Sequence, residues 1–381
     1  MMAVNRIYHL HVIIVFAIFL NFSLFKFGQG YVGTAYVFSA LFFLFFPISF
    51  GKEMLVPVLF FIITLFSSIV STFEFGFNYK MMTCANIIIG SAIGVILSKV
   101  YCNRLGDFFS KVCYFLLGAN LIRDFFYFIN GHLAYNVYDF FFVTNGGPNI
   151  EVSVLAIASL LTRDVYARFS IIIYVLLKSS LYDSRAGLII AFLSAFFYFR
   201  DMLNVKTFYI IVIYICMLMA VFLGLFFETI KYSFLDHFVK FDLELSYLMQ
   251  EQGRLFLWSS GWDIFKNNLF GVGVGNGIKN LESAYHFSVA ENNFHNIYIQ
   301  YLVEGSFLSV FVFLIYAKRV VFTVFTRDVF RKSTYGAATA MLISGLFQWT
   351  GYGIFEWLVF GLFLGQVSMV EAQTSKSMEN G

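Results

Sequence analysis

The chain alternates long apolar stretches with short polar segments. Several stretches of about 20 residues contain no Asp, Glu, Lys or Arg, among them Phe27–Gly51, Met54–Phe73 and Thr207–Phe227. A helix needs about 20 mostly apolar residues to cross the hydrocarbon core of a bilayer. The pattern therefore predicts an all-α fold, a polytopic bundle of about 12 transmembrane helices.

The apolar stretches set the expected division of the chain. We predict membrane helices near 7–25, 31–50, 54–73, 81–99, 108–129, 148–162, 166–182, 186–200, 207–228, 296–316, 333–351 and 354–371. The first nine fill 1–229, a long outer loop with short amphipathic helices fills 230–293, the last three fill 294–371, and 372–381 form a cytoplasmic tail. Loops of such length usually carry function.

Lys and Arg are distributed unevenly between the two sides of this topology. With the N-terminus in the cytoplasm, fifteen of the 25 Lys and Arg residues fall in inner segments and four in the short outer segments. Cytoplasmic segments of membrane proteins are enriched in these residues. The chain is therefore predicted to have both termini in the cytoplasm and its long loop outside.

The composition supports a membrane protein. Hydrophobic residues make up 60% of the chain and charged residues 12%, which excludes a soluble domain. The first apolar run, Ile7–Phe25, is too long for a cleaved signal peptide. The four cysteines show no paired spacing and predict neither a disulfide framework nor a zinc site. Nothing indicates a nucleic-acid partner.

Two arginines on the predicted outer side are candidates for binding an anion. Arg185, in "YDSRAGLIIAF", precedes an apolar helix, and Arg254 opens a segment with Trp258 and Trp262 at helical spacing. A single Arg beside the membrane is often only an interfacial anchor. As a pair they favour phosphate binding, because the planar guanidinium can donate two hydrogen bonds and stays charged.

A glycine-rich run follows the second arginine. The sequence Gly-Val-Gly-Val-Gly-Asn-Gly occupies 271–277. It is not surrounded by a βαβ unit, so it does not indicate a dinucleotide site. We interpret it as a tight turn that needs glycine dihedral angles rather than a loop that cradles a phosphate.

A polar group marks the start of the tenth predicted membrane helix. His295 and Asn296 follow Asn292 and Asn293 and precede an apolar run. One asparagine is expected to cap the helix. A helix N-terminus disfavours positive charge, which would leave the imidazole of His295 neutral and able to accept a proton. The alternative is an ordinary interfacial histidine.

One charged pair lies well inside a predicted membrane helix. Arg123 and Asp124 are adjacent within the span 108–129. Such residues are rare and often functional in membranes. The pair either holds neighbouring helices together or forms part of a substrate groove, and the sequence leaves both interpretations open.

The order of these motifs resembles the O-antigen polymerase and O-antigen ligase superfamily. "SRAG" comes first, then "GR" with Trp and "NLFGVGVG", then "HNIY", between about Ser184 and Gly305. The resemblance implies a bacterial inner-membrane glycosyltransferase that acts at the periplasmic face without a metal, a nucleotide sugar or another cofactor. It also implies an undecaprenyl-pyrophosphate-linked donor and a chain-length regulator as a partner.

The resemblance also implies roles for single residues. Arg185 and Arg254 would bind the departing pyrophosphate, and His295 would assist the acceptor hydroxyl in an inverting transfer. Asn296 and Arg123 are further candidates for substrate binding. No acidic residue is an obvious general base, so His295 takes that role by elimination.

Three activities fit a chain of this kind. A polymerase joins lipid-linked glycans to one another, whereas a ligase moves the glycan to the lipid A core. The stretches "HNIYIQYLVEGSF" and "LFGVGVGNG" and the Phe-rich composition look closer to polymerases. A flippase for lipid-linked oligosaccharides is a third reading, although the chain shows no convincing inverted repeat of the kind that transporters carry.

Overall fold

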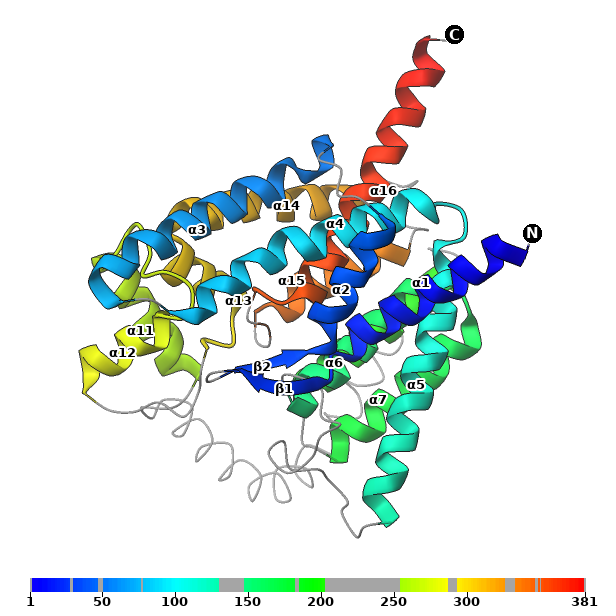
Figure 1. The fold of residues 1–381 in the computed structure, drawn as a ribbon, viewed down its shortest axis with the longest axis horizontal. Coiled ribbons are helices and arrows are strands. Elements are labelled where there is room, and N and C mark those ends of the chain that lie inside the picture. Colours follow the sequence, from blue (N-terminus) through cyan, green and yellow to red (C-terminus); the bar gives the residue numbers. More distant parts are fainter. Residues whose placement is uncertain are drawn as a thin grey trace, which may run out of the picture.

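The computed structural model is mostly helical (Figure 1). It describes residues 2–27, 30–46, 51–76, 78–129, 147–181, 185–202, 254–286, 293–325, 333–346, 349 and 351–379. The predicted span 207–228 and much of the predicted loop 230–293 lie outside these residues.

The first half of the chain supplies helices and one hairpin. Its elements are α1 (Met2–Leu20), β1 (Ser23–Phe27), β2 (Gly30–Gly33), α2 (Thr34–Phe45), the 3-10 helix η1 (Lys52–Met54), α3 (Leu55–Phe75), the 3-10 helix η2 (Tyr79–Cys84), α4 (Ala85–Val100), α5 (Leu105–Ile129), α6 (Gly147–Leu161), α7 (Val165–Leu181) and α8 (Arg185–Met202). β1 and β2 pair antiparallel.

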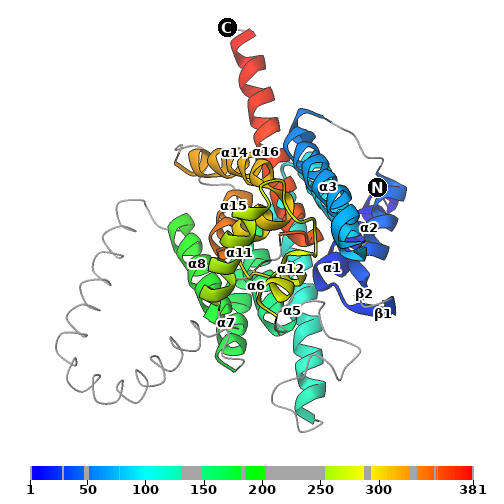
Figure 2. The ribbon, with the colours of Figure 1, turned by 90° about the vertical axis from the view of Figure 1, so that its left-hand side faces the viewer.

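The second half begins with two short helices from the predicted loop. Its elements are α11 (Arg254–Asn267), α12 (Gly277–Tyr285), α13 (Ile297–Gln300), the π-helix η3 (Tyr301–Gly305), α14 (Phe307–Phe325), α15 (Ser333–Ser344) and α16 (Ile354–Glu379). α11 and α12 lie together at one end of the molecule, beside one end of α3 (Figures 1 and 2).

Four described helices are long and apolar enough to cross a membrane. They are Lys52–Glu74, Tyr79–Val100, Leu105–Ile129 and Ile354–Ala372. They coincide with the predicted spans near 54–73, 81–99, 108–129 and 354–371, because the backbone of a mostly apolar run of this length satisfies its hydrogen bonds in lipid by forming a helix.

The first two predicted spans are too long. α1 ends at Leu20, and the residue that follows, Asn21, has a left-handed φ of 43°. The hairpin comes next, and the Thr34 N–H donates to the carbonyl of Phe22 at 2.7 Å. This hairpin occupies the end of the predicted span 7–25 and the start of the span 31–50.

Two later predicted spans are interrupted. The span 296–316 divides into α13, η3 and α14, with Ser306 between them at a φ of 95°. The predicted span 333–351 is longer than the observed helix, because α15 ends at Ser344. The carbonyl of the next residue, Gly345, accepts a hydrogen bond of 2.8 Å from the N–H of Ile297, so the end of α15 meets the start of α13.

α4 and α16 are the most closely packed helix pair, because glycines allow their backbones to approach each other. A Cβ atom on Gly94 would lie 2.2 Å from the carbonyl oxygen of Leu358, and one on Gly361 would lie 2.3 Å from that of Ser91. Small residues at helix contacts permit such packing in membranes. This close packing joins α4 to the last helix of the chain, with α3 against α4 and α15 against α16.

Candidate functional site

Arg254 is the first residue of α11, as the sequence predicted. The helix buries Leu257 and Ile264 in a small core, while Trp262 on another face is 50% exposed. The core is completed by α12, the glycine run, the segment before α13 and η3, through Ile278, Leu281, Val272, Phe294 and Val303. α11 therefore has one apolar face against the protein and one aromatic face outside it.

His295 holds a backbone conformation that is uncommon for a residue with a side chain. Its φ is 51°, in the left-handed region, where the Cβ atom is crowded. Its N–H donates to Oδ1 of Asn293 at 2.8 Å. Residues held in such conformations cluster at functional sites.

Asn296 is the asparagine that caps the following helix. Its Oδ1 accepts hydrogen bonds from the N–H groups of Tyr298 at 3.0 Å and Ile299 at 3.2 Å. The expectation that one asparagine of this cluster serves as an N-cap is confirmed. The cap directs the chain into α13 directly after His295.

The helix that carries Arg254 and the segment that carries His295 are joined directly. The indole N–H of Trp258, one turn after Arg254, donates to the carbonyl of Phe294 at 2.9 Å. The backbone of α11 also lies close to α13, because a Cβ atom on Gly261 would come within 2.7 Å of Cγ2 of Ile299. The fold thus brings two of the predicted site elements together.

The glycine run forms the turn that the sequence predicted. Gly271, Gly273 and Gly275 have φ angles of 80°, 79° and 82°, which other residues rarely adopt. The Val272 and Gly273 N–H groups donate to the carbonyls of Val303 and Glu304 at 2.8 and 3.0 Å. These N–H groups face the protein, so they are not directed toward a phosphate.

Arg123 lies in a cluster of buried charges. Its Nη1 and Nη2 each donate to the carboxylate of Glu151 at 2.5 Å, in a two-point arrangement. Nζ of Lys178 donates to Oε1 of the same carboxylate at 2.6 Å. The three side chains come from α5, α6 and α7 and are at most 6% exposed, so they tie these helices together.

The cluster extends to Asp124 and Asn120. The Asp124 carboxylate accepts from Nζ of Lys178 at 2.9 Å and from the hydroxyl of Tyr174. Nη2 of Arg123 also donates to Asp124 at 3.1 Å and to Oδ1 of Asn120 at 2.9 Å. Direct contact between Arg123 and a substrate would therefore require exchange of one of these partners.

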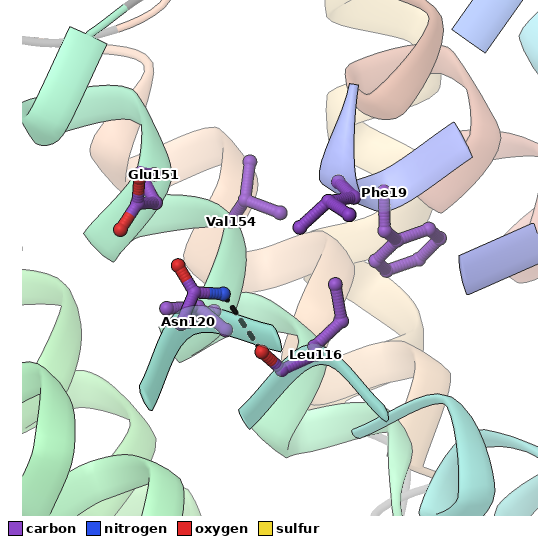
Figure 3. A pocket seen from close by; sticks show the side chains of 7 residues that line it. Phe19, Leu116, Asn120, Glu151 and Val154 are labelled. Atoms are coloured by element: carbon purple, nitrogen blue, oxygen red, sulfur yellow. Dashed lines mark hydrogen bonds between the residues drawn. The ribbon is translucent and has the colours of Figure 1, made fainter. Parts of the chain in front are cut away.

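A small cavity borders the charge cluster (Figure 3). Phe19 of α1, Leu116 and Asn120 of α5, and Glu151 and Val154 of α6 contribute to its lining. The Asn120 side chain donates to the carbonyl of Leu116 at 2.8 Å. The lining is mostly apolar, which suits a packing defect beside the cluster better than a sugar-binding groove.

Arg185 is the first residue of α8, one position before the predicted start of this helix near 186, and its side chain lies outside the described part of the structure. The described residues include no group of three or more His, Cys, Asp or Glu side chains that could hold a metal ion.

Lys80 is a cation beside the glycine run that sequence reasoning did not select. A Cβ atom on Gly275 would lie 2.5 Å from Cβ of Lys80.

Sequence reasoning missed several buried charges, three of which are the most deeply buried. Glu151, Lys178 and Glu304 are each at most 3% exposed. Their signal was available, because each interrupts an apolar run, and an ionisable residue within a membrane segment is a functional candidate by default. Their partners, however, lie on other helices and could not be identified from spacing.

A search of curated proteins found no match to the chain. Residues 169–314 match the family model described as O-antigen ligase. The matched region contains Arg185, Arg254, His295 and the glycine run. Members of this family are glycosyl-transferring enzymes of polysaccharide biosynthesis. Over this region the chain, with its apolar helices, is thus similar to membrane enzymes of the O-antigen polymerase and ligase superfamily.

Proposed function

We propose that the protein polymerises O-antigen repeat units carried on undecaprenyl pyrophosphate, at the periplasmic face of the bacterial inner membrane. The observation that carries this proposal is the contact between α11 and the His295 segment, made by Trp258 and Phe294 inside the family-matched region. This contact supports the proposal, because α11 starts at Arg254, the candidate phosphate-binding cation, and Phe294 precedes His295, the candidate proton acceptor.

The reaction in this proposal is an inverting displacement. The acceptor hydroxyl attacks the anomeric carbon of the donor, His295 takes the hydroxyl proton, and the bond to the lipid pyrophosphate breaks. Arg185 and Arg254 bind the pyrophosphate and stabilise the negative charge that develops on it. The donor already stores the energy of the bond, so the enzyme mainly orients two substrates and stabilises the leaving group.

Two further residues contribute to substrate binding in this proposal. The cap uses Oδ1 of Asn296, and its Nδ2 group is the part that would donate to a sugar oxygen. Arg123 would support the donor from the charge cluster, by exchanging one of its present partners. The bilayer holds the lipid tail, and a chain-length regulator would limit the number of repeats.

The relative positions of the site elements support an outer-face location. Val274 of the glycine run donates through its N–H to Oγ of Ser68 on α3 at 3.0 Å. Asn276 accepts a hydrogen bond of 2.7 Å from Nδ2 of Asn78, which follows α3. The charge distribution supports a common outer position for this end of α3 and for the loop that contains α11.

The test uses purified protein, an undecaprenyl-pyrophosphate-linked repeat as donor, and separate measurements of donor binding and polymer formation. Arg254→Lys and Arg185→Lys keep the charge but lose the two-point geometry, so both should weaken donor binding and polymer formation. Lys266→Arg, on the exposed end of α11, is the matched control and should leave both unchanged. Polymer formation at the normal rate by both Lys variants would contradict the phosphate-binding role.

His295→Ala should separate binding from chemistry. Donor binding should persist while the transfer rate falls by about 10²–10⁴-fold, because a positioned proton acceptor contributes about this much. Transfer at the normal rate would return His295 to an interfacial role.

The ligase remains a second candidate, because the matching family model is described as O-antigen ligase. The two enzymes share the leaving-group machinery and differ in the acceptor. In a strain that lacks the protein, lipopolysaccharide with a single repeat on the core would support the polymerase, and bare core would support the ligase. Repeat units trapped on the cytoplasmic face would indicate a flippase instead.

A further inference from the structure

The break between η3 and α14 leaves backbone carbonyl groups in the protein interior that can accept hydrogen bonds from another segment. η3 has π-helical geometry, and Ser306 ends it with a left-handed φ of 95°. The carbonyls of Val303 and Glu304 consequently accept hydrogen bonds from Val272 and Gly273. π-helical turns often mark functional sites, and here the turn supplies acceptors to a separate segment.

The side chain of Glu304 extends this contact. It is 2% exposed, and its Oε1 accepts a hydrogen bond of 3.2 Å from the N–H of Gly277, the first residue of α12. Its backbone carbonyl accepts a second bond, of 2.8 Å, from Oγ of Ser67 on α3. Glu304 thus binds Gly273 and Gly277 of the glycine run and Ser67 of α3.

The glycine run is held from its other side by α3. The Val274 N–H donates to Ser68 Oγ at 3.0 Å, and Asn276 Nδ2 donates to Ser71 Oγ at 3.3 Å. The turn is therefore enclosed between α3 and η3. Because α11 precedes the turn and η3 follows the His295 segment, the turn links the element that starts at Arg254 to the element that follows His295.

We propose that Glu304 is a positioning residue, which clamps the 271–277 turn to η3 and so fixes α11 relative to the His295 segment. Its role in transfer rests on the proposed function. The clamp itself is a property of the folded protein and can be measured without substrate.

A positioning role differs from a chemical role in its response to glutamine. Glu304→Gln keeps an acceptor oxygen for the Gly277 N–H and removes the carboxylate. Glu304→Leu has a similar size and leaves that buried N–H without its acceptor, which is costly in a dry interior. A clamp needs only the acceptor, whereas proton transfer needs the carboxylate.

The first measurement is hydrogen exchange of the 271–277 amides in purified protein, in detergent. Glu304→Leu should raise their exchange rate at least about tenfold, and Glu304→Gln should leave it within about threefold of the original. Glu74→Leu, at an exposed carboxylate near the same end of α3, is the control. An unchanged exchange rate in Glu304→Leu would overturn the clamp.

The second measurement is the transfer rate at equal amounts of folded protein. Glu304→Leu should transfer about 100-fold more slowly, because a displacement of about 1 Å in a catalytic group has an effect of this size. Glu304→Gln should stay within about threefold. Equally slow transfer by both variants, with the turn still protected in Glu304→Gln, would overturn positioning in favour of a chemical role.

A milder variant covers the case in which Glu304→Leu does not fold. Ser68→Ala removes the acceptor for the Val274 N–H and should raise exchange and slow transfer by about 3–10-fold. Loosening of the turn without any effect on transfer would overturn the positioning role. If the original protein transfers nothing to any acceptor, the proposed function fails, and the exchange measurement still decides the clamp.

Discussion

Two buried polar regions stabilise this protein in different ways. In the charge cluster, side chains of opposite sign on α5, α6 and α7 pair with one another, led by Arg123, Glu151 and Lys178. In the clamp around 271–277, most partners are backbone groups of a turn and of an interrupted helix. Both regions satisfy polar groups that would be costly to leave unpaired away from water.

The difference separates support from positioning. Charges that pair with one another tie helices together, and removing one partner leaves another charge buried and unpaired. Backbone hydrogen bonds in a turn are individually weaker, and together they set the path of the chain. The turn follows α11 and lies against η3, which follows the His295 segment, so the second region acts on the candidate site while the first mainly stabilises the bundle.

The largest expected effect comes from breaking the charge cluster. Glu151→Leu leaves Arg123 and Lys178 with Asp124 as their remaining carboxylate in the cluster and should lower the free energy of unfolding by about 3–5 kcal/mol. Denaturant titration in detergent micelles measures it. A loss below about 1 kcal/mol would mean that the cluster does not stabilise the bundle.

A balanced double variant sharpens this test. Glu151→Leu combined with Lys178→Met removes one charge of each sign and should recover at least about 2 kcal/mol of the loss. No recovery would show that side-chain packing, rather than charge, is what Glu151 contributes.

The next effect comes from adding a methyl group to the turn. Gly273→Ala places Cβ 2.0 Å from Oγ of Ser71 at a φ of 79°, and should lower the free energy of unfolding by about 2–4 kcal/mol. Gly76→Ala is the matched control, because its φ is 76° and nothing lies within 4 Å of the added Cβ. Gly76→Ala should lower the free energy of unfolding by only about 1–2 kcal/mol. If the two variants lowered it equally, the close contact between Gly273 and α3 would be contradicted.

The smallest effect comes from the cap. Asn296→Ala removes the acceptor for the Tyr298 and Ile299 N–H groups and should lower the free energy of unfolding by about 1 kcal/mol. Asp263→Asn breaks an exposed ion pair with Lys266 and should change it by less than about 0.5 kcal/mol. If the cap variant were no worse than this surface control, the segment after His295 would be held by its other contacts alone.

Apolar length predicted the long helices well and their interruptions poorly. α3, α4 and α5 were predicted from mostly apolar runs, because the backbone of such a run in lipid must satisfy its hydrogen bonds within the helix. The ends of α1 and α15 depend on hydrogen bonds between distant residues, such as that from Ile297 to Gly345, and no local pattern encodes such a partner.

The candidate site divides in the same manner. The start of α11 at Arg254 and the positive φ angles of the glycine run were predicted, because helix periodicity and glycine content are local properties. Glu304 was missed, because its partner Gly277 lies 27 positions away and only the fold brings them into contact.

By itself, the sequence determined that this is a polytopic helical membrane protein and where several of its helices and its glycine turn lie. Hydrophobic length, helix periodicity and glycine dihedral angles act over a few residues, so they can be read without a fold. The tertiary structure alone decided which buried charges pair and which carbonyls hold the turn beside His295. Those partners are chosen by helix packing, which brings together groups that are far apart along the chain.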